Sequence, residues 1–162
     1  MLSICQWIHQ TSLSVGIRES IWVYPILNVL HCVGILLVAG TIVVLDLRLL
    51  GAGLRQLPVS IVARQVLPWT LGGFCFMAVT GLLLAWSEPM RLYRSLFFPW
   101  KLIFLAMAGL NALLFHRGVY LGVHTWDSSL VTPLRARIAG VVSILCWACV
   151  IAAGRAIGYE AL

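Results

Sequence analysis

Four long apolar stretches constrain this chain more than any other feature. They cover Ser20–Leu45, Val66–Trp86, Leu102–Phe115 and Ile138–Gly154. A hydrocarbon core of ~30 Å needs ~20 residues of helix to cross it. A backbone inside lipid must satisfy its own hydrogen bonds, so spans are helices or closed barrels. The strict alternation of a barrel strand is missing, so the pattern predicts an all-α, transmembrane four-helix bundle.

Composition supports this class and limits the domain count. Hydrophobic residues make up 62% of the chain and charged residues 10%, whereas a soluble domain carries roughly 25% charge. The 162 residues leave room for four spans and short connections, so we expect a single integral membrane domain over residues 1–162. The net charge of +6 comes from basic residues near span ends, where they face lipid phosphates. The expected partner is therefore membrane lipid and not nucleic acid.

Aromatic residues mark the boundaries independently of hydropathy. We expect helices near residues 20–46, 58–86, 98–122 and 136–158, preceded by a short interfacial helix within Met1–Gln10. Tryptophan is typical of membrane interfaces. Those near the predicted boundaries are Trp7, Trp22, Trp69, Trp86, Trp100 and Trp126.

The connections carry the topology signal. Ser14–Ser20 is interpreted as a polar joint, and four spans place both termini on one side of the membrane. The loops on the opposite side hold six arginines against five basic residues on the terminal side, which favours termini outside. The charges expected at helix ends are Asp46, Arg48, Lys101 and Arg117.

His31 is the most suggestive polar residue, because it lies well inside the first span. Asn28 stands one turn before it on the same helical face. Ionisable groups at this depth are costly and usually face the bundle interior. His31 is therefore either a haem or metal ligand, a proton-relay group, or a neutral histidine bonded to a neighbouring helix. His116, near the far end of the third span, is a weaker cofactor candidate and suits a boundary position at headgroup level.

A haem held between His31 and His116 is excluded by depth. The first and third spans run in the same direction, and the two histidines differ in depth by roughly 9–12 residues, or ~14–18 Å. One iron cannot take axial nitrogens so far apart. A b-type haem would need His31 with a methionine, a ligand from a second chain, or no sixth ligand.

Other polar groups in the spans have simpler interpretations. Cys146 and Cys149 form a C-x-x-C on one helix face and could bind a soft metal with Cys75, but buried cysteine usually acts as a small hydrophobe. We expect packing cysteines and no metal site. Asn111 and Ser143 are expected to hydrogen-bond between helices.

Several short motifs resemble an uncharacterised family of bacterial four-helix membrane proteins, catalogued as a domain of unknown function. The motifs run from Pro25 through His31 and Gly40 to Asp46-Leu-Arg48-Leu-Leu-Gly51, then Leu67-Pro68-Trp69, and then Lys101, Gly109-Leu-Asn111 and Phe115-His116-Arg117-Gly118. The resemblance implies four spans in a bacterial inner membrane, with periplasmic termini by the basic count. It implies no activity.

These observations favour a non-catalytic accessory or structural subunit of a larger membrane complex, redox or light-harvesting. Such a subunit would pack against other membrane proteins or a second copy. The alternative is a b-type haem or metal-binding electron-transfer protein using His31. A small transporter is the third hypothesis, with a polar path along Asn28, His31, Asn111 and Ser143. The pattern indicates no catalytic group.

Overall fold

The computed structural model describes residues 2–129 and 131–160. This part of the chain is built from helices and contains no strand. Its first long helix is α3 (Val23–Leu50), and its second is α4 (Val59–Ser87). The third span joins α6 (Phe97–Arg117) to the 3₁₀ helix η1 (Val119–Thr125), and the fourth is α7 (Leu134–Tyr159). All four are long and apolar enough to cross a membrane, which confirms the predicted fold class.

Shorter helices surround one end of the long ones. The expected N-terminal helix is α1 (Leu2–His9), and α5 (Pro89–Arg94) follows α4 directly. Ser14–Ser20 is not the predicted polar joint, because most of it belongs to α2 (Ser12–Glu19). The side chain of Thr11 caps this helix by accepting a hydrogen bond from the Ser14 N–H at 3.3 Å, and such caps offset a low helix propensity.

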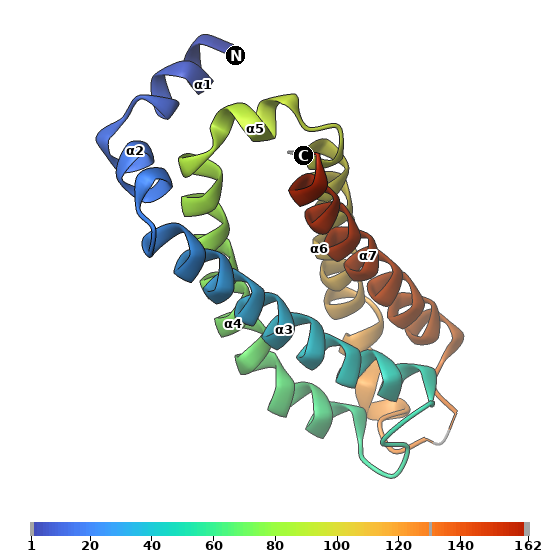
Figure 1. Cartoon of the computed structure of the whole chain (residues 1–162). Helices are drawn as coiled ribbons and strands as arrows, with labels where there is room; N and C mark the ends of the chain where they lie inside the picture. The colour runs from blue at the N-terminus through green and yellow to red at the C-terminus, as the bar shows by residue number, and fades with distance from the viewer. Residues whose placement is uncertain (1, 130, 161–162) are drawn as a thin grey trace.

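The long helices form two antiparallel hairpins. α3 packs mainly against α4, α6 packs mainly against α7, and contacts between α3 and α7 join the two pairs. Figure 1 shows the hairpins diverging towards the end where α5 lies, so this end is the wide end and the opposite one the narrow end. α1 and the last turn of α7 both lie at the wide end (Figure 1), as an even number of spans requires.

Two apolar clusters hold the hairpins together. The larger one draws on all four long helices and contains Val38, Met77, Ala108, Cys146, Trp147 and Val150. The smaller one lies at the narrow end and contains Leu49, Val59, Phe115, Val123 and Ala136. The helices bury little else against each other. Only 6% of the most apolar window of the third span and 33% of that of α7 are buried within the chain. Lipid must cover the rest.

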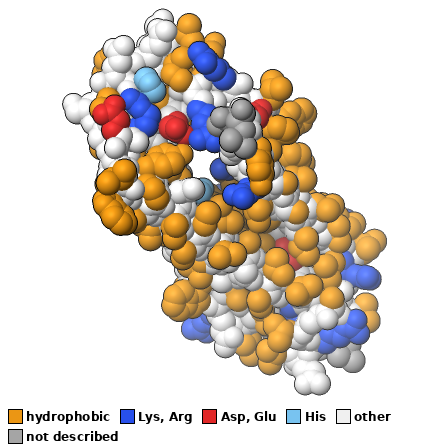
Figure 2. All heavy atoms as spheres, viewed as in Figure 1, with side chains coloured by type: hydrophobic (Ala, Val, Ile, Leu, Met, Phe, Trp, Pro, Cys, Tyr) orange, Lys and Arg blue, Asp and Glu red, His pale blue; other side chains and the backbone are white. Residues whose placement is uncertain are grey.

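The surface has the layering of a membrane protein. In Figure 2 hydrophobic side chains cover the middle of the molecule, and charged side chains gather towards its two ends. An exposed apolar belt of this size would promote aggregation in water. The chain is therefore a multi-pass membrane protein.

The narrow end is closed by Asp127, which lies after η1. Its carboxylate accepts hydrogen bonds from the Ser60 N–H at 2.7 Å and the Ser60 hydroxyl at 2.5 Å. Its carbonyl accepts from the Val59 N–H at 3.2 Å and from Arg48 Nη2 at 3.3 Å. Asp127 thus caps the start of α4 from a distant loop, and the carboxylate also suits the positive end of the helix dipole.

We predict that acid weakens this cap. Burial acts to raise the pKa of Asp127, but the Ser60 hydrogen bonds and the charges of His124 and Arg48 outweigh it and lower the pKa. A lowered pKa gives stability that is full above the unfolded-state pKa of ~3.9 and is lost as pH falls through the folded-state value.

Thermal unfolding in detergent micelles, followed by circular dichroism from pH 6 to pH 3, tests this prediction. Asp127→Asn should lose up to ~1 kcal/mol at pH 6 and show a smaller further drop on acidification than the wild type. Parallel pH profiles for the two proteins would contradict the role of Asp127.

Candidate functional site

His31 lies on α3 in the half nearer the wide end, and its side chain faces α4. The ring Nδ1 is 3.0 Å from the hydroxyl of Thr80. The ring also packs on the backbone at Gly81, where an added Cβ would lie 2.9 Å from His31 Cε1. Any larger residue at position 81 would therefore displace the imidazole.

The hydrogen bonds around Thr80 favour one tautomer of His31. The Thr80 hydroxyl lies 2.9 Å from the Phe76 carbonyl and 3.1 Å from the Met77 carbonyl. Its single proton is donated to one of these carbonyls, so its oxygen accepts a hydrogen from His31 Nδ1. Nε2 then carries a lone pair, and within residues 2–129 and 131–160 the side-chain hydrogen bond of His31 is the one made by Nδ1. This is the arrangement of a histidine that ligates a metal through Nε2.

Lys101 brings a positive charge to the same region. It belongs to the second turn of α6 and lies along α7, with Nζ 3.4 Å from where a Cβ at Gly154 would be. It is close enough to His31 to act on it electrostatically. Figure 2 shows the surface hollowed beneath α5, with lysine or arginine and histidine side chains at the border of the hollow. Lys101 therefore lies near the end of its helix, as predicted, and its side chain also lies in the interior of the wide end.

A polar roof links the hairpins above this hollow. Glu88 Oε2 accepts hydrogen bonds from the Tyr24 hydroxyl at 3.0 Å and from Arg91 Nη1 at 2.8 Å. Arg91 Nη2 donates to the carbonyls of Ile157 and Gly158 at 3.2 and 3.0 Å. These bonds tie α3, α4 and α5 to the end of α7 and leave Arg91 facing the wide end.

The remaining polar residues of the spans do not meet at His31. Asn28, one turn before His31 on α3, is exposed and is not its hydrogen-bond partner. Asn111 donates from Nδ2 to the Ala139 carbonyl of α7 at 3.0 Å. The Nδ1 of His116 lies 2.8 Å from the Ala112 carbonyl of its own helix, at the opposite end of α6 from Lys101. Because these groups are dispersed over separate faces and depths, they outline no shared polar path.

A second polar cluster lies near the narrow end, around Asp46 and Arg48. The two residues are only 5% and 1% exposed, so they are buried as well as close to the helix end. Asp46 lies beside Ser143 of α7. Arg48 Nε donates to the Leu57 carbonyl at 2.7 Å, and its Nη2 reaches Asp127 as described above. This cluster fastens loops to α3.

The cysteines are dispersed in the same way. Cys146 belongs to the larger apolar cluster, whereas Cys75 is exposed on α4. Within residues 2–129 and 131–160 no three histidine, cysteine, aspartate or glutamate side chains come together as a metal site would require.

Sequence reasoning missed Thr80 and Gly81. One signal could have found them. α3 and α4 are antiparallel neighbours; His31 lies eight positions after the start of α3 at Val23, and Thr80 lies seven positions before the end of α4 at Ser87. A hydroxyl beside a glycine at matching depth is a natural partner for an imidazole in lipid.

The chain belongs to a family of unknown function, DUF6644, whose model matches residues 7–160. The expected resemblance to an uncharacterised family is thereby confirmed. No curated protein and no solved structure matches the chain.

We predict that Gly81→Ala disturbs His31 whereas Gly72→Ala does not. Both glycines lie in α4, but an added Cβ at Gly72 would meet nothing within 4 Å. Gly81→Ala should cost ~1–3 kcal/mol through overpacking, and Gly72→Ala should be neutral or gain up to ~1 kcal/mol of helix propensity. Thermal unfolding in micelles and the ¹⁵N shift of His31 Nδ1 measure both effects. Equal unfolding temperatures and an unchanged shift would refute the close contact.

Proposed function

We propose that this DUF6644 protein is an electron-transfer subunit of a bacterial inner membrane and binds a b-type haem through His31. The hydrogen bond from His31 Nδ1 to Thr80 is the observation that carries the proposal. It leaves Nε2 with a lone pair to donate to a Lewis acid, and it fixes the orientation of the ring as a hydrogen-bond partner behind a metal ligand does. A bound haem would supply one-electron chemistry at its iron.

The charges at the wide end support a defined orientation for the haem. His31 lies deepest, Lys101 lies nearer the helix ends, and Arg91 lies beyond it in the roof. A haem carries two anionic propionates on one edge, and anions in lipid need a cationic partner. Lys101 is the residue that would hold a propionate while His31 takes the iron, because the guanidinium of Arg91 is already bonded to Glu88 and to two carbonyls of α7.

The second axial position must be filled differently or left open. His116 lies near the far end of α6, fifteen residues after Lys101, which is ~22 Å along a helix. It cannot reach an iron held by His31. The iron would take a methionine or a ligand from a partner chain as its second ligand, or would have no second protein ligand.

A non-catalytic accessory role is the second candidate, and α6 favours it. This helix is the least covered span, and an added Cβ at its Gly109 would meet nothing within 4 Å. Helices associate in lipid through close packing at small residues, because apolar surface alone gives no driving force there. A membrane protein partner or a second copy could pack on this face of α6.

We predict a Soret band in the purified protein that depends on His31. His31→Ala should abolish the band. Thr80→Val should reduce haem retention by about 10–100-fold, because the hydrogen bond between Thr80 and His31 Nδ1 is lost. His116→Ala should keep the band. His31→Met tests folding and ligation together, because a thioether also ligates haem iron and shifts its spectrum. A wild type without haem after expression with haem supplied, or a His31→Ala band of full intensity, would reject the haem.

A separate prediction tests the accessory role. In mild detergent the protein should migrate as a complex larger than its monomer, and Gly109→Leu should release the monomer by blocking close approach. Gly72→Leu on α4 is the control, because that position is equally open. Size-exclusion chromatography with light scattering measures the mass. A monomer in native membrane extracts, or equal behaviour of the two variants, would count against a partner on α6.

A further inference from the structure

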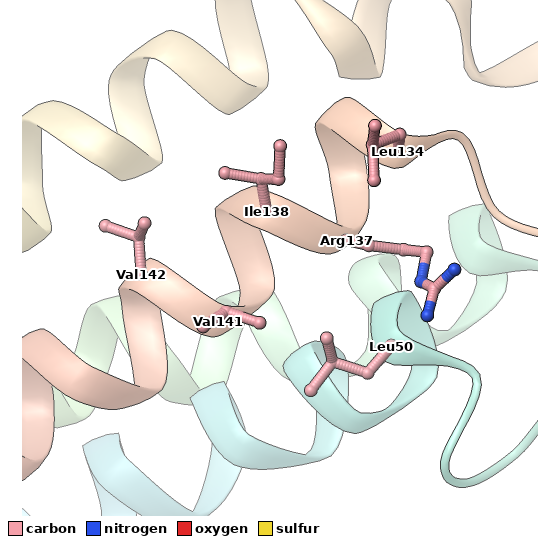
Figure 3. A pocket seen from close by; sticks show the side chains of 6 residues that line it. All are labelled: Leu50, Leu134, Arg137, Ile138, Val141 and Val142. Atoms are coloured by element: carbon pink, nitrogen blue, oxygen red, sulfur yellow. The ribbon is translucent and has the colours of Figure 1, made fainter.

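An apolar groove lies at the narrow end, away from the His31 site. It has a volume of about 290 Å³ and is formed by the end of α3 and the first turns of α7. Its lining residues are Leu50, Leu134, Arg137, Ile138, Val141 and Val142. Figure 3 shows these side chains along one stretch of α7, with the guanidinium of Arg137 reaching towards Leu50 of α3.

The groove runs from the membrane boundary into the apolar layer. α7 begins at Leu134, so Arg137 lies in its first turn, and Val141 lies one turn deeper. Every lining residue except Arg137 is apolar. Arg137 is exposed, and its guanidinium makes no hydrogen bond or salt bridge within the described residues 2–129 and 131–160. The unpaired guanidinium of Arg137 therefore lies where the apolar groove meets the membrane boundary.

We propose that this groove binds one acyl chain of an anionic phospholipid, with the phosphate against Arg137. The charge of the narrow end supports an anionic headgroup. Arg55, Arg64, Arg117 and Arg135 lie at this end as well, whereas the carboxylate of Asp127 is occupied by Ser60. Each basic residue near a membrane surface attracts anionic lipid by ~1 kcal/mol, and the start of α7 adds the positive end of a helix dipole.

The lining of the groove suits a hydrocarbon chain with a charged head. Five of its six residues are apolar, and the single cation stands at the membrane boundary. A single flexible hydrocarbon chain fits this space and reaches the depth of Val141 without disturbing either helix.

Native mass spectrometry of the full-length protein from nanodiscs of phosphatidylglycerol or phosphatidylcholine tests the proposal. The wild type should retain phosphatidylglycerol in preference to phosphatidylcholine. Arg137→Gln should weaken that retention about fivefold, the equivalent of ~1 kcal/mol. Val141→Trp should also weaken it by filling the groove.

Two matched variants serve as controls. Arg135→Gln removes a charge next to the groove but lines no part of it, and Leu114→Trp enlarges an exposed residue of α6 outside the groove. Both should retain phosphatidylglycerol as the wild type does, and circular dichroism should show equal helicity for all variants. Equal losses in Arg137→Gln and Arg135→Gln would show diffuse attraction to the surface and overturn the proposal. Full retention in Val141→Trp, or no preference for phosphatidylglycerol in the wild type, would overturn it as well.

Discussion

The contact between α3 and α7 is the interaction on which the rest of the structure depends. Among the long helices in the described part of the chain, it is the extended contact that joins the two hairpins. The two helices approach closely near the narrow end, where an added Cβ at Gly140 would lie 3.3 Å from the Asp46 carbonyl and 3.5 Å from Leu49 Cβ. Because the hairpins meet here, they are free to diverge at the other end. The hollow near His31 follows from that divergence.

Lipid as a solvent decides where the polar groups of α3 point. Each unsatisfied polar group in hydrocarbon costs several kcal/mol. His31 accordingly turns to Thr80 on α4 and Arg48 turns to the loops at the narrow end, whereas Asp46 lies beside Ser143 of α7 with its Oδ2 unpartnered among the described residues. One helix thus contacts three different elements through polar residues, while its remaining surface stays apolar. These bonds fix the rotation of α3 about its axis, which apolar packing alone would specify weakly.

The spans could be predicted from the sequence because their signal is local. Apolar length and interfacial tryptophans fix where α3, α4, α6 and α7 begin and end to within a few residues, with η1 extending the third span. The depth of His31 follows from the same count. α2 could not be predicted in this way, because its helix depends on Thr11 as a cap and on contacts with α4. The Ser14 hydroxyl donates to the Ser87 carbonyl at 3.0 Å across that contact.

The candidate site could be predicted only in part, because its other members are set by long-range packing. The sequence predicts Lys101 as a charge at a helix end. Its side chain lies inwards because the hairpins diverge and Gly154 has no side chain to exclude it. The sequence predicts Asp127 as a loop residue. In the structure it caps α4, which begins far from it in the sequence. Neither position carries a periodic pattern, so neither arrangement could be deduced before the helices were placed.

The positive charge of Lys101 also bears on the chemistries open to the half-buried imidazole of His31. A proton relay requires His31 to carry a positive charge during each transfer. The ammonium of Lys101 opposes that charge, and the low dielectric of the membrane interior strengthens the repulsion. A ligand that combines a Lewis-acidic centre with anionic groups reverses this balance, because its anions neutralise Lys101 while Nε2 of His31 donates its lone pair. The haem that we propose meets this requirement, whereas a proton relay does not.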